Sequence, residues 1–168
     1  MSEVLYTERL MLRPIVDADE QRIVEILGNY EVSKWLSSVP HPFGPEDVKT
    51  RDAQGKTRWP DVMAISHNGS FVGAISNSPH IGYWLAPEAQ GKGFATEVVA
   101  AVCRFVFEDQ GRHELVSGHY ADNHASRRVL EKCGFVKERE GQQFSLARQE
   151  KRAHIWVKLT RDRWRLTS

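Results

Sequence analysis

Two glycines that flank a lysine mark the segment of the chain best suited to chemistry, Gln90-Gly91-Lys92-Gly93-Phe94-Ala95. This turn lies between a predicted strand and a long predicted helix. Glycines let backbone N–H groups approach a ligand closely, and the first N–H groups of a helix have no partner within it. Because the helix dipole favours an anion at that end and Lys92 adds a positive charge, the turn is suited to binding a polyphosphate.

The spacing of the glycines excludes two common phosphate-binding motifs. A P-loop ends in Gly-Lys-Ser/Thr, whereas Phe94 follows Gly93 here. A dinucleotide fingerprint follows an early strand and has a third small residue in register, whereas this turn lies in the middle of the chain. A turn that serves packing alone remains an alternative when the two glycines are considered by themselves.

Hydrophobic periodicity and turn residues predict the elements that position this turn. The expected strands cover residues 10–14, 62–66, 70–76, 80–85, 115–120, 135–140 and 152–159. The expected helices are one capped by Asp17 or Asp19 and ended by Gly28, a short one through residues 32–36, a polar one over 46–58, a long one with an apolar face at 98–106, and a short one over 125–133. Asn68-Gly69 supplies the positive φ angles of a tight hairpin turn. The pattern indicates one α+β or α/β domain over residues 1–168 with a mixed sheet.

The composition favours a globular protein without a strong charge bias. The chain has 168 residues, with 23 Lys and Arg against 22 Asp and Glu, so it has no overall attraction for nucleic acid or membrane. Cys103 and Cys133 fall in apolar helical patterns, which predicts buried, reduced thiols. The first residues lack the features of a signal peptide, and no apolar run approaches membrane-spanning length. We expect a cytoplasmic protein without a metal site.

Four further segments carry a family resemblance. They are Thr7-Glu8-Arg9-Leu10 with Leu12-Arg13-Pro14, the run from Ile81 to Leu85 before Pro87 and the glycine-rich turn, Asn123-His124-Ala125-Ser126 before the run from Val129 to Phe135, and the ending from Leu159 to Trp164. In this order they resemble the GCN5-related N-acetyltransferase (GNAT) superfamily, and specifically its branch similar to the ribosomal-protein N-terminal (RimJ/RimL-like) acetyltransferases. The resemblance covers nearly the whole chain.

The resemblance implies a GNAT fold, an α+β three-layer arrangement in which a mixed sheet of six to seven strands splays apart in the middle and about four helices flank it. It also implies that acetyl-CoA, as cosubstrate, enters this opening between the strand that ends at Leu85 and the strand that ends near Tyr120. The implied cofactor-binding residues are the backbone of Leu85, Ala86 and Pro87 for the pantetheine amides, the turn Gln90, Gly91, Lys92, Gly93, Phe94 and Ala95 for the pyrophosphate, and Asn123 and Ser126 beside the pantetheine arm.

Acetyl transfer needs a proton donor for the departing thiolate and a neutral amine. Ser126, in the first turn of a predicted helix, is the first candidate donor, and Tyr120 is the second. His80 and His119 are candidate bases, although relatives often have a carboxylate where His80 stands. Each candidate also has a structural alternative: Ser126 and Asn123 as helix caps, Tyr120 as a packing residue, and the histidines as structural or exposed groups. Deprotonation of the amine by bulk water is a further alternative.

The sequence therefore predicts an acetyl-CoA-dependent N-acetyltransferase in which a primary amine attacks the thioester directly, without a cysteine nucleophile. The acceptor could be a protein N-terminus, an amino acid or another small amine, and the protein a monomer or a homodimer. We expect Trp35, Trp84 and the loop 38–43 to border the acceptor pocket. An acyl-CoA-binding module that is catalytically silent and acts through a protein partner is the alternative, and a structural module without a cofactor is a third.

Overall fold

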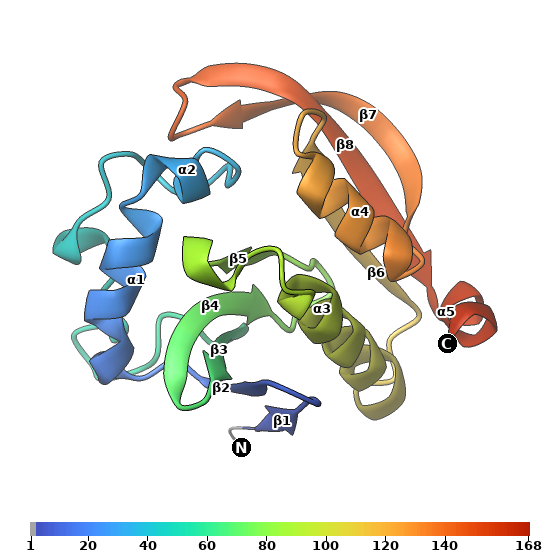
Figure 1. The fold of residues 1–168 in the computed structure, drawn as a ribbon, viewed down its shortest axis with the longest axis horizontal. Helices are drawn as coiled ribbons and strands as arrows, with labels where there is room; N and C mark the ends of the chain where they lie inside the picture. The colour runs from blue at the N-terminus through green and yellow to red at the C-terminus, as the bar shows by residue number, and fades with distance from the viewer. Residues whose placement is uncertain (1–2) are drawn as a thin grey trace.

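The computed structural model describes residues 3–168, and within them eight strands form two antiparallel sheets (Figure 1). The first sheet has the order β1-β2-β3-β4-β5, with β1 Leu5–Tyr6, β2 Met11–Pro14, β3 Val62–His67, β4 Ser70–Ser76 and β5 Tyr83–Leu85. The second has the order β6-β8-β7, with β6 Glu114–Tyr120, β7 Val136–Ser145 and β8 Glu150–Thr160. The helices are α1 Glu20–Leu27, α2 Tyr30–Ser33, α3 Phe94–Arg104, α4 His124–Lys132 and α5 Arg161–Thr167.

The two sheets touch at one short parallel bridge, where His80 pairs with Val116. The Val116 N–H donates to the Pro79 carbonyl over 2.9 Å, and the Ile81 N–H donates to the Val116 carbonyl over 2.8 Å. Beyond this bridge, β5 and β6 separate (Figure 1). The predicted splayed sheet is therefore confirmed, although residues 3–168 form eight strands and five α-helices rather than six to seven strands and about four helices.

Helix α3 holds the glycine-rich turn in place because its apolar face is fully buried. Val98, Val99 and Val102 have no exposed surface, and Val106 continues the same face into a π-helical last turn over Phe105–Asp109. Burial of each such side chain contributes about 1.5–3 kcal/mol. The helix therefore anchors firmly in the core, with its N-terminus at the opening between the sheets.

Most of the predicted elements are confirmed. The β3–β4 hairpin turns at Asn68 and Gly69, whose φ angles are 50° and 80°, and α1 ends at Gly28. No helix within the described part of the chain is both long and apolar enough to cross a membrane. Strand β1 and helix α5 were not predicted, because two residues and a polar terminal helix leave little periodicity to detect.

The predicted polar helix over residues 46–58 is wrong. Within that range the structure has the end of a 3-10 turn, Pro45–Asp47, and an isolated antiparallel bridge between Arg51 and Thr57. Thr50 is buried, and its hydroxyl lies 2.6 Å from Asp17 Oδ1 and 2.8 Å from Glu20 Oε1. Its N–H also donates to Glu20 over 3.0 Å. Contacts with the start of α1, rather than local helix propensity, therefore fix this segment.

Strands β7 and β8 run well beyond the predicted residues 135–140 and 152–159, and their hairpin reaches the segment after α2 (Figure 1). The Leu146 N–H donates to the Ser37 carbonyl over 3.1 Å. The Arg148 Nε donates to the Lys34 carbonyl over 2.9 Å. We call this contact the arch, because it connects the two halves of the chain on the side of the opening away from α3.

Candidate active site

A cavity of about 760 Å³ occupies the opening between β5 and β6. It gathers residues that the sequence singled out in separate motifs: His80, Leu85, Gln90, Gly91, Gly93, Phe94, Ala95, His119, Tyr120, Asn123 and Ser126. Trp35, Ser38 and Trp84, which we expect at the acceptor pocket, also line it, whereas residues 39–43 do not. The cavity therefore joins the glycine-rich turn to all four candidate catalytic side chains.

The glycine-rich turn has the backbone conformation that its sequence suggests. Gly91 and Gly93 have φ angles of 74° and 81°, in the left-handed region that favours glycine. Gly93 is the N-cap of α3, so the N–H groups of the first helical turn face the end of the cavity without an acceptor inside the helix. Three of the predicted cofactor residues do not line the cavity: Ala86, Pro87 and Lys92.

The backbone between β5 and the turn is already hydrogen-bonded within the protein. The Ala86 N–H donates to the Val72 carbonyl over 2.8 Å, and the Gln90 side chain donates to the Leu85 carbonyl over 3.0 Å. Pro87 has no N–H and begins a 3-10 turn over Pro87–Ala89. The Ala86 N–H is therefore engaged within the protein, and the expected pairing of the backbone of Leu85 to Pro87 with the pantetheine amides stays a prediction.

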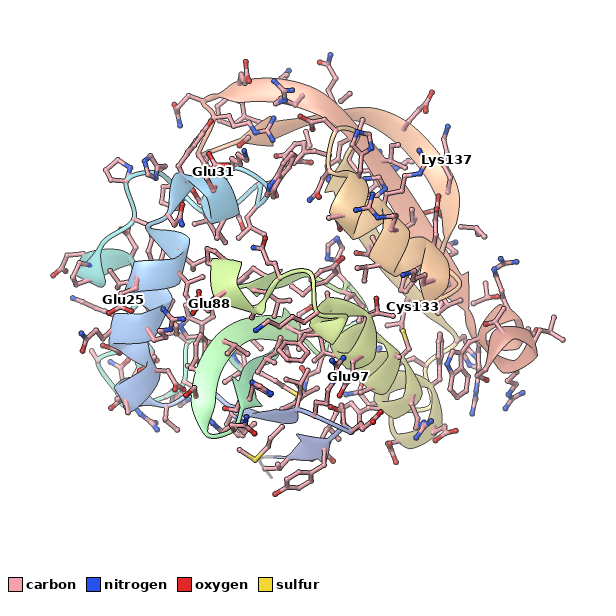
Figure 2. All side chains as sticks on the ribbon, viewed as in Figure 1. Glu25, Glu31, Glu88, Glu97, Cys133 and Lys137 are labelled. Carbon is pink, nitrogen blue, oxygen red and sulfur yellow. The ribbon has the colours of Figure 1, made fainter. Side chains whose placement is uncertain are left out.

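Arg9 connects the first strands to the glycine-rich turn, a role the sequence did not reveal. Its guanidinium donates to the Lys92 carbonyl over 2.9 Å and to Glu97 over 2.8 Å, and lies 4.7 Å from the Phe94 ring centre. Glu97 also accepts from the Arg9 N–H at 2.8 Å and from the Thr7 hydroxyl at 2.5 Å. Figure 2 shows Glu97 on the part of α3 nearest β1 and β2. Burial alone would raise the pKa of Glu97, but the hydrogen bonds from Thr7 and Arg9 lower it, so the carboxylate is held ionised.

Ser126 is hydrogen-bonded to Tyr83, with 2.9 Å between the two hydroxyl oxygens. Both residues line the cavity, Tyr83 from β5 and Ser126 from the first turn of α4. Burial raises the pKa of Tyr83 to about 12, against the opposing effect of the Ser126 hydrogen bond. Asn123 caps α4 by accepting from the Ser126 N–H over 3.2 Å. The cap is thus made by Asn123, and the Ser126 side chain is directed to Tyr83.

The side chains of Tyr120 and His119 each make a hydrogen bond to a backbone carbonyl group. Tyr120 is buried, and its hydroxyl donates to the Phe144 carbonyl over 3.3 Å, so its proton is already engaged within the protein. His119 Nδ1 lies 2.9 Å from the Tyr120 carbonyl. Because a carbonyl can only accept, Nδ1 carries the proton, and Nε2 of the neutral ring has the free lone pair. His80 is exposed at the rim of the cavity.

His154 and Trp156, two residues that sequence reasoning missed, also line the cavity. Their side chains lie on one face of β8, and the buried side chains of Val157 and Leu159 lie on the other. Aromatic residues on the polar face of a half-buried strand are the signal that could have identified them. Among residues 3–168, no group of three His, Cys, Asp or Glu side chains is arranged to hold a metal ion.

The two cysteines have no disulfide partner and lie outside the cavity wall. Burial raises the pKa of the Cys103 thiol, and burial also raises that of Cys133 to about 11. Cys133 lies at the end of α4 (Figure 2) and contacts the Thr96 carbonyl on α3 at 3.8 Å. Both thiols are therefore protonated near neutral pH and are weak nucleophiles.

A splayed sheet with a glycine-rich turn at the N-terminus of a helix in its opening is the arrangement of a GNAT fold. The model of the acetyltransferase (GNAT) domain matches residues 9–136. The chain belongs to the GNAT family, whose members use acetyl-CoA, and its relatives place it in the RimJ/RimL-like branch.

Two relatives show this similarity along most of the chain. N-acetyltransferase YoaA of Bacillus subtilis is 29% identical over 153 residues, which cover 82% of this chain and 85% of the relative. The [ribosomal protein uS5]-alanine N-acetyltransferase of Escherichia coli is 28% identical over 178 residues, which cover 95% of this chain and 92% of the relative.

Two solved structures share the fold. A GNAT-family acetyltransferase from Bacillus anthracis superimposes with a TM-score of 0.81 at 21% identity, covering 95% of this chain and 99% of that chain. RimL, a ribosomal L7/L12 alpha-N-protein acetyltransferase in complex with coenzyme A, has a TM-score of 0.79 at 17% identity, covering 94% of this chain and 98% of that chain.

Proposed function

We propose that this protein transfers the acetyl group of acetyl-CoA to a primary amine by direct attack of the amine on the thioester. The observation that carries the proposal is that one cavity joins the left-handed glycine turn at α3 to the Tyr83–Ser126 hydroxyl pair at α4. The first feature suits a polyphosphate and the second suits a leaving group that needs a proton. Acetyl-CoA carries both, and it supplies the activated acyl group.

The chemistry of the cavity wall fits coenzyme A. At one end lie the N–H groups of the first turn of α3, with Gly91 and Gly93 leaving the backbone uncovered. Arg128 and Lys132 on α4 add positive charge to the wall. Within residues 3–168, the wall contains no Asp or Glu side chain that would repel phosphates. The Gln90–Ala95 turn would therefore hold the pyrophosphate.

Ser126 acts as proton donor in the proposed reaction. As the amine nitrogen bonds to the acyl carbon, the C–S bond breaks and the sulfur takes the proton of the Ser126 hydroxyl. Tyr83, 2.9 Å from Ser126 Oγ, can return that proton, and solvent then returns to Tyr83 the proton that the amine has given up. The high pKa of Tyr83 keeps its hydroxyl protonated until then.

The amine must lose its proton, and His119 is the better placed of the two candidate bases. Its ring is fixed by the Nδ1 hydrogen bond to Tyr120, so that Nε2 is the lone-pair atom of the neutral form. His80 lies at the exposed rim, where exchange with bulk water serves equally well. An acceptor that reaches the site already neutral needs neither.

The acceptor class follows from the chemistry and from the relatives together. The uS5-alanine enzyme and RimL are named for action on ribosomal-protein N-termini. We extend this to the present chain only as a class: an α-amine of a protein N-terminus, an amino acid or another small primary amine. We also propose that the chain acts as one domain over residues 1–168.

Release of free coenzyme A from acetyl-CoA, measured with a panel of amines and N-terminal peptides, tests the proposed function. At least one amine should be acetylated, and Ser126→Ala should slow that reaction without loss of coenzyme A binding. Acetyl-CoA that binds without turnover on every amine would instead support the silent acyl-CoA-binding module.

A further inference from the structure

The end of the cavity nearest the arch has a wall of four rings: Trp35, Tyr120, His154 and Trp156. We call it the aromatic wall. The Tyr120 and His154 ring centres lie 5.1 Å apart in an edge-on contact, and those of His154 and Trp156 lie 4.4 Å apart. These are favourable separations for aromatic pairs. Three of the four rings belong to the second sheet, and Trp35 follows α2 on the other side of the opening.

Glycines on both neighbouring strands make room for this wall. A methyl group at Gly118 on β6 would overlap His154 Cε1, and one at Gly141 on β7 would lie 3.2 Å from Trp156 Cζ3. Neither glycine has a positive φ angle, so the backbone conformation does not require glycine at these positions. At Gly118 the His154 ring occupies the space that a methyl group would need, and at Gly141 the Trp156 ring leaves only a tight fit for one.

Cations lie behind the aromatic wall. The Arg139 guanidinium lies 3.6 Å from the Trp156 ring centre. Arg148 lies 4.8 Å from the Trp35 ring centre and 5.4 Å from that of Tyr120, and Lys34 lies 5.1 Å from that of Trp35. Two of these cations are paired with carboxylates that do not line the cavity: Arg148 with Asp122, and Lys34 with Glu31.

The pKa of His154 indicates how this end of the cavity acts on a positive charge. Burial, together with the nearby His119, Arg139 and His80, lowers the pKa of His154 to about 4. Its Nδ1 is buried without a hydrogen-bond partner within residues 3–168. An environment that opposes a charge on imidazole also opposes one on a bound ammonium group.

We propose that the aromatic wall is the acceptor subsite, and that it selects primary amines bound in their neutral form, with a flat apolar group beside the amine, over amines that carry a second positive charge. The rings supply contact area for an apolar group, and the Arg139 guanidinium behind Trp156 repels a charged one. This inference rests on the proposed function, because it names the amine that the transfer uses.

The test compares three tripeptide amides, Phe-Ala-Ala, Ala-Ala-Ala and Lys-Ala-Ala, by kcat/KM at saturating acetyl-CoA. They differ only in the side chain next to the α-amine. We expect the Phe peptide to exceed the Lys peptide by about tenfold or more, the size of discrimination that one side-chain pocket supplies. Trp156→Leu should remove most of the advantage of Phe over Ala, and Arg139→Gln should reduce the discrimination against Lys.

Trp59→Leu is the matched control, because Trp59 is also half-buried but lies outside the cavity. It should leave the order of the peptides unchanged. If Trp156→Leu does not fold, His154→Gln tests the same wall, and a melting temperature that still rises with coenzyme A shows that the variant is folded. A Lys peptide used as well as the Phe peptide by the unmodified enzyme would overturn the inference. Failure of every amine, with coenzyme A still bound, would defeat the proposed function itself.

Discussion

The Tyr83 hydroxyl on β5 and the Ser126 hydroxyl on α4 lie 2.9 Å apart, so that a hydrogen bond spans the opening between the two sheets. Each residue is attached to a different half of the fold, and neither half could place this pair alone. The parallel bridge between His80 and Val116 holds β5 beside β6 at one end of the opening, and so helps to set the distance that this hydrogen bond spans.

Ser126→Ala should lower kcat by about 100-fold, at the lower end for general acid catalysis. Tyr83→Phe should lower kcat by a smaller factor, and should add little in the Ser126→Ala background because the two hydroxyls act in series. The affinity for coenzyme A, measured by titration, should barely change. Ser70→Ala, an exposed serine on β4, is the control. If kcat falls only in proportion to stability, Ser126 has a structural role and Tyr120 becomes the next donor to test.

Arg9→Gln should raise KM for acetyl-CoA by about tenfold with little change in kcat, since it removes charge-assisted hydrogen bonds that hold the Lys92 carbonyl and Glu97. This result would make Arg9 a positioning residue, and steady-state kinetics separates the two parameters. Arg127→Gln breaks a comparable pair with Glu131 on the exposed side of α4 and should leave KM unchanged. Equal losses in both variants would show that Arg9 does not position the turn.

Gly93→Asp should abolish the stabilisation that acetyl-CoA gives to the fold. A ligand at 100 times its Kd adds about 2.7 kcal/mol to the free energy of unfolding, and a carboxylate at this turn would repel the phosphates. Gly55→Asp is the control, because Gly55 also has a positive φ, 77°, but lies away from the cavity. Thermal melting with and without acetyl-CoA gives the answer: an equal shift in both variants would place the phosphates elsewhere.

Acidification should destabilise the protein through His154. Its pKa of about 4 in the folded protein is below the ordinary 6.5, so the unfolded chain binds the proton more readily. This contribution to stability is complete above about pH 6.5 and is lost as the pH falls toward about 4. Urea unfolding of wild type and His154→Phe at pH 7.5 and 4.5 should show a larger loss for wild type. His113→Phe, at an exposed position, should behave as wild type does.

The pH dependence of kcat/KM should follow the acceptor. A free α-amine has a pKa of about 7.7–8.0, so an appreciable fraction is neutral at pH 7. The rate should rise with pH and level off near the pKa of each amine, moving when the amine is exchanged. An inflection that stays fixed for every acceptor, and disappears in His119→Gln, would assign the proton to an enzymic base.

The sequence was sufficient for the features that depend on local chemistry. The glycine-rich turn, the Asn123 cap and the Asn68-Gly69 hairpin were all predicted, because each depends on residue types at a fixed spacing. The helix expected over residues 46–58 failed because Thr50 is fixed by Asp17 and Glu20, which no local pattern could show.

Contacts between distant segments account for the site residues that were missed. Arg9 and Glu97 are 88 residues apart, and Tyr83 and Ser126 are 43 apart. Tyr83 belongs to a strand motif, and no local pattern marks it as a partner of Ser126. His154 and Trp156 differ from these, because their position on the polar face of β8 was visible as alternation, and only their link to the cavity required the fold.

The arch has a consequence for divergence among related enzymes. Arg148 binds the Lys34 carbonyl, 114 residues away, and stacks on both Trp35 and Tyr120. A substitution that adapts one of these two segments to a new acceptor also removes hydrogen-bonding and packing contacts from the other segment. Substitutions in residues 34–37 and 146–148 should therefore be inherited in pairs, and a preference for a new amine should seldom evolve by a single step.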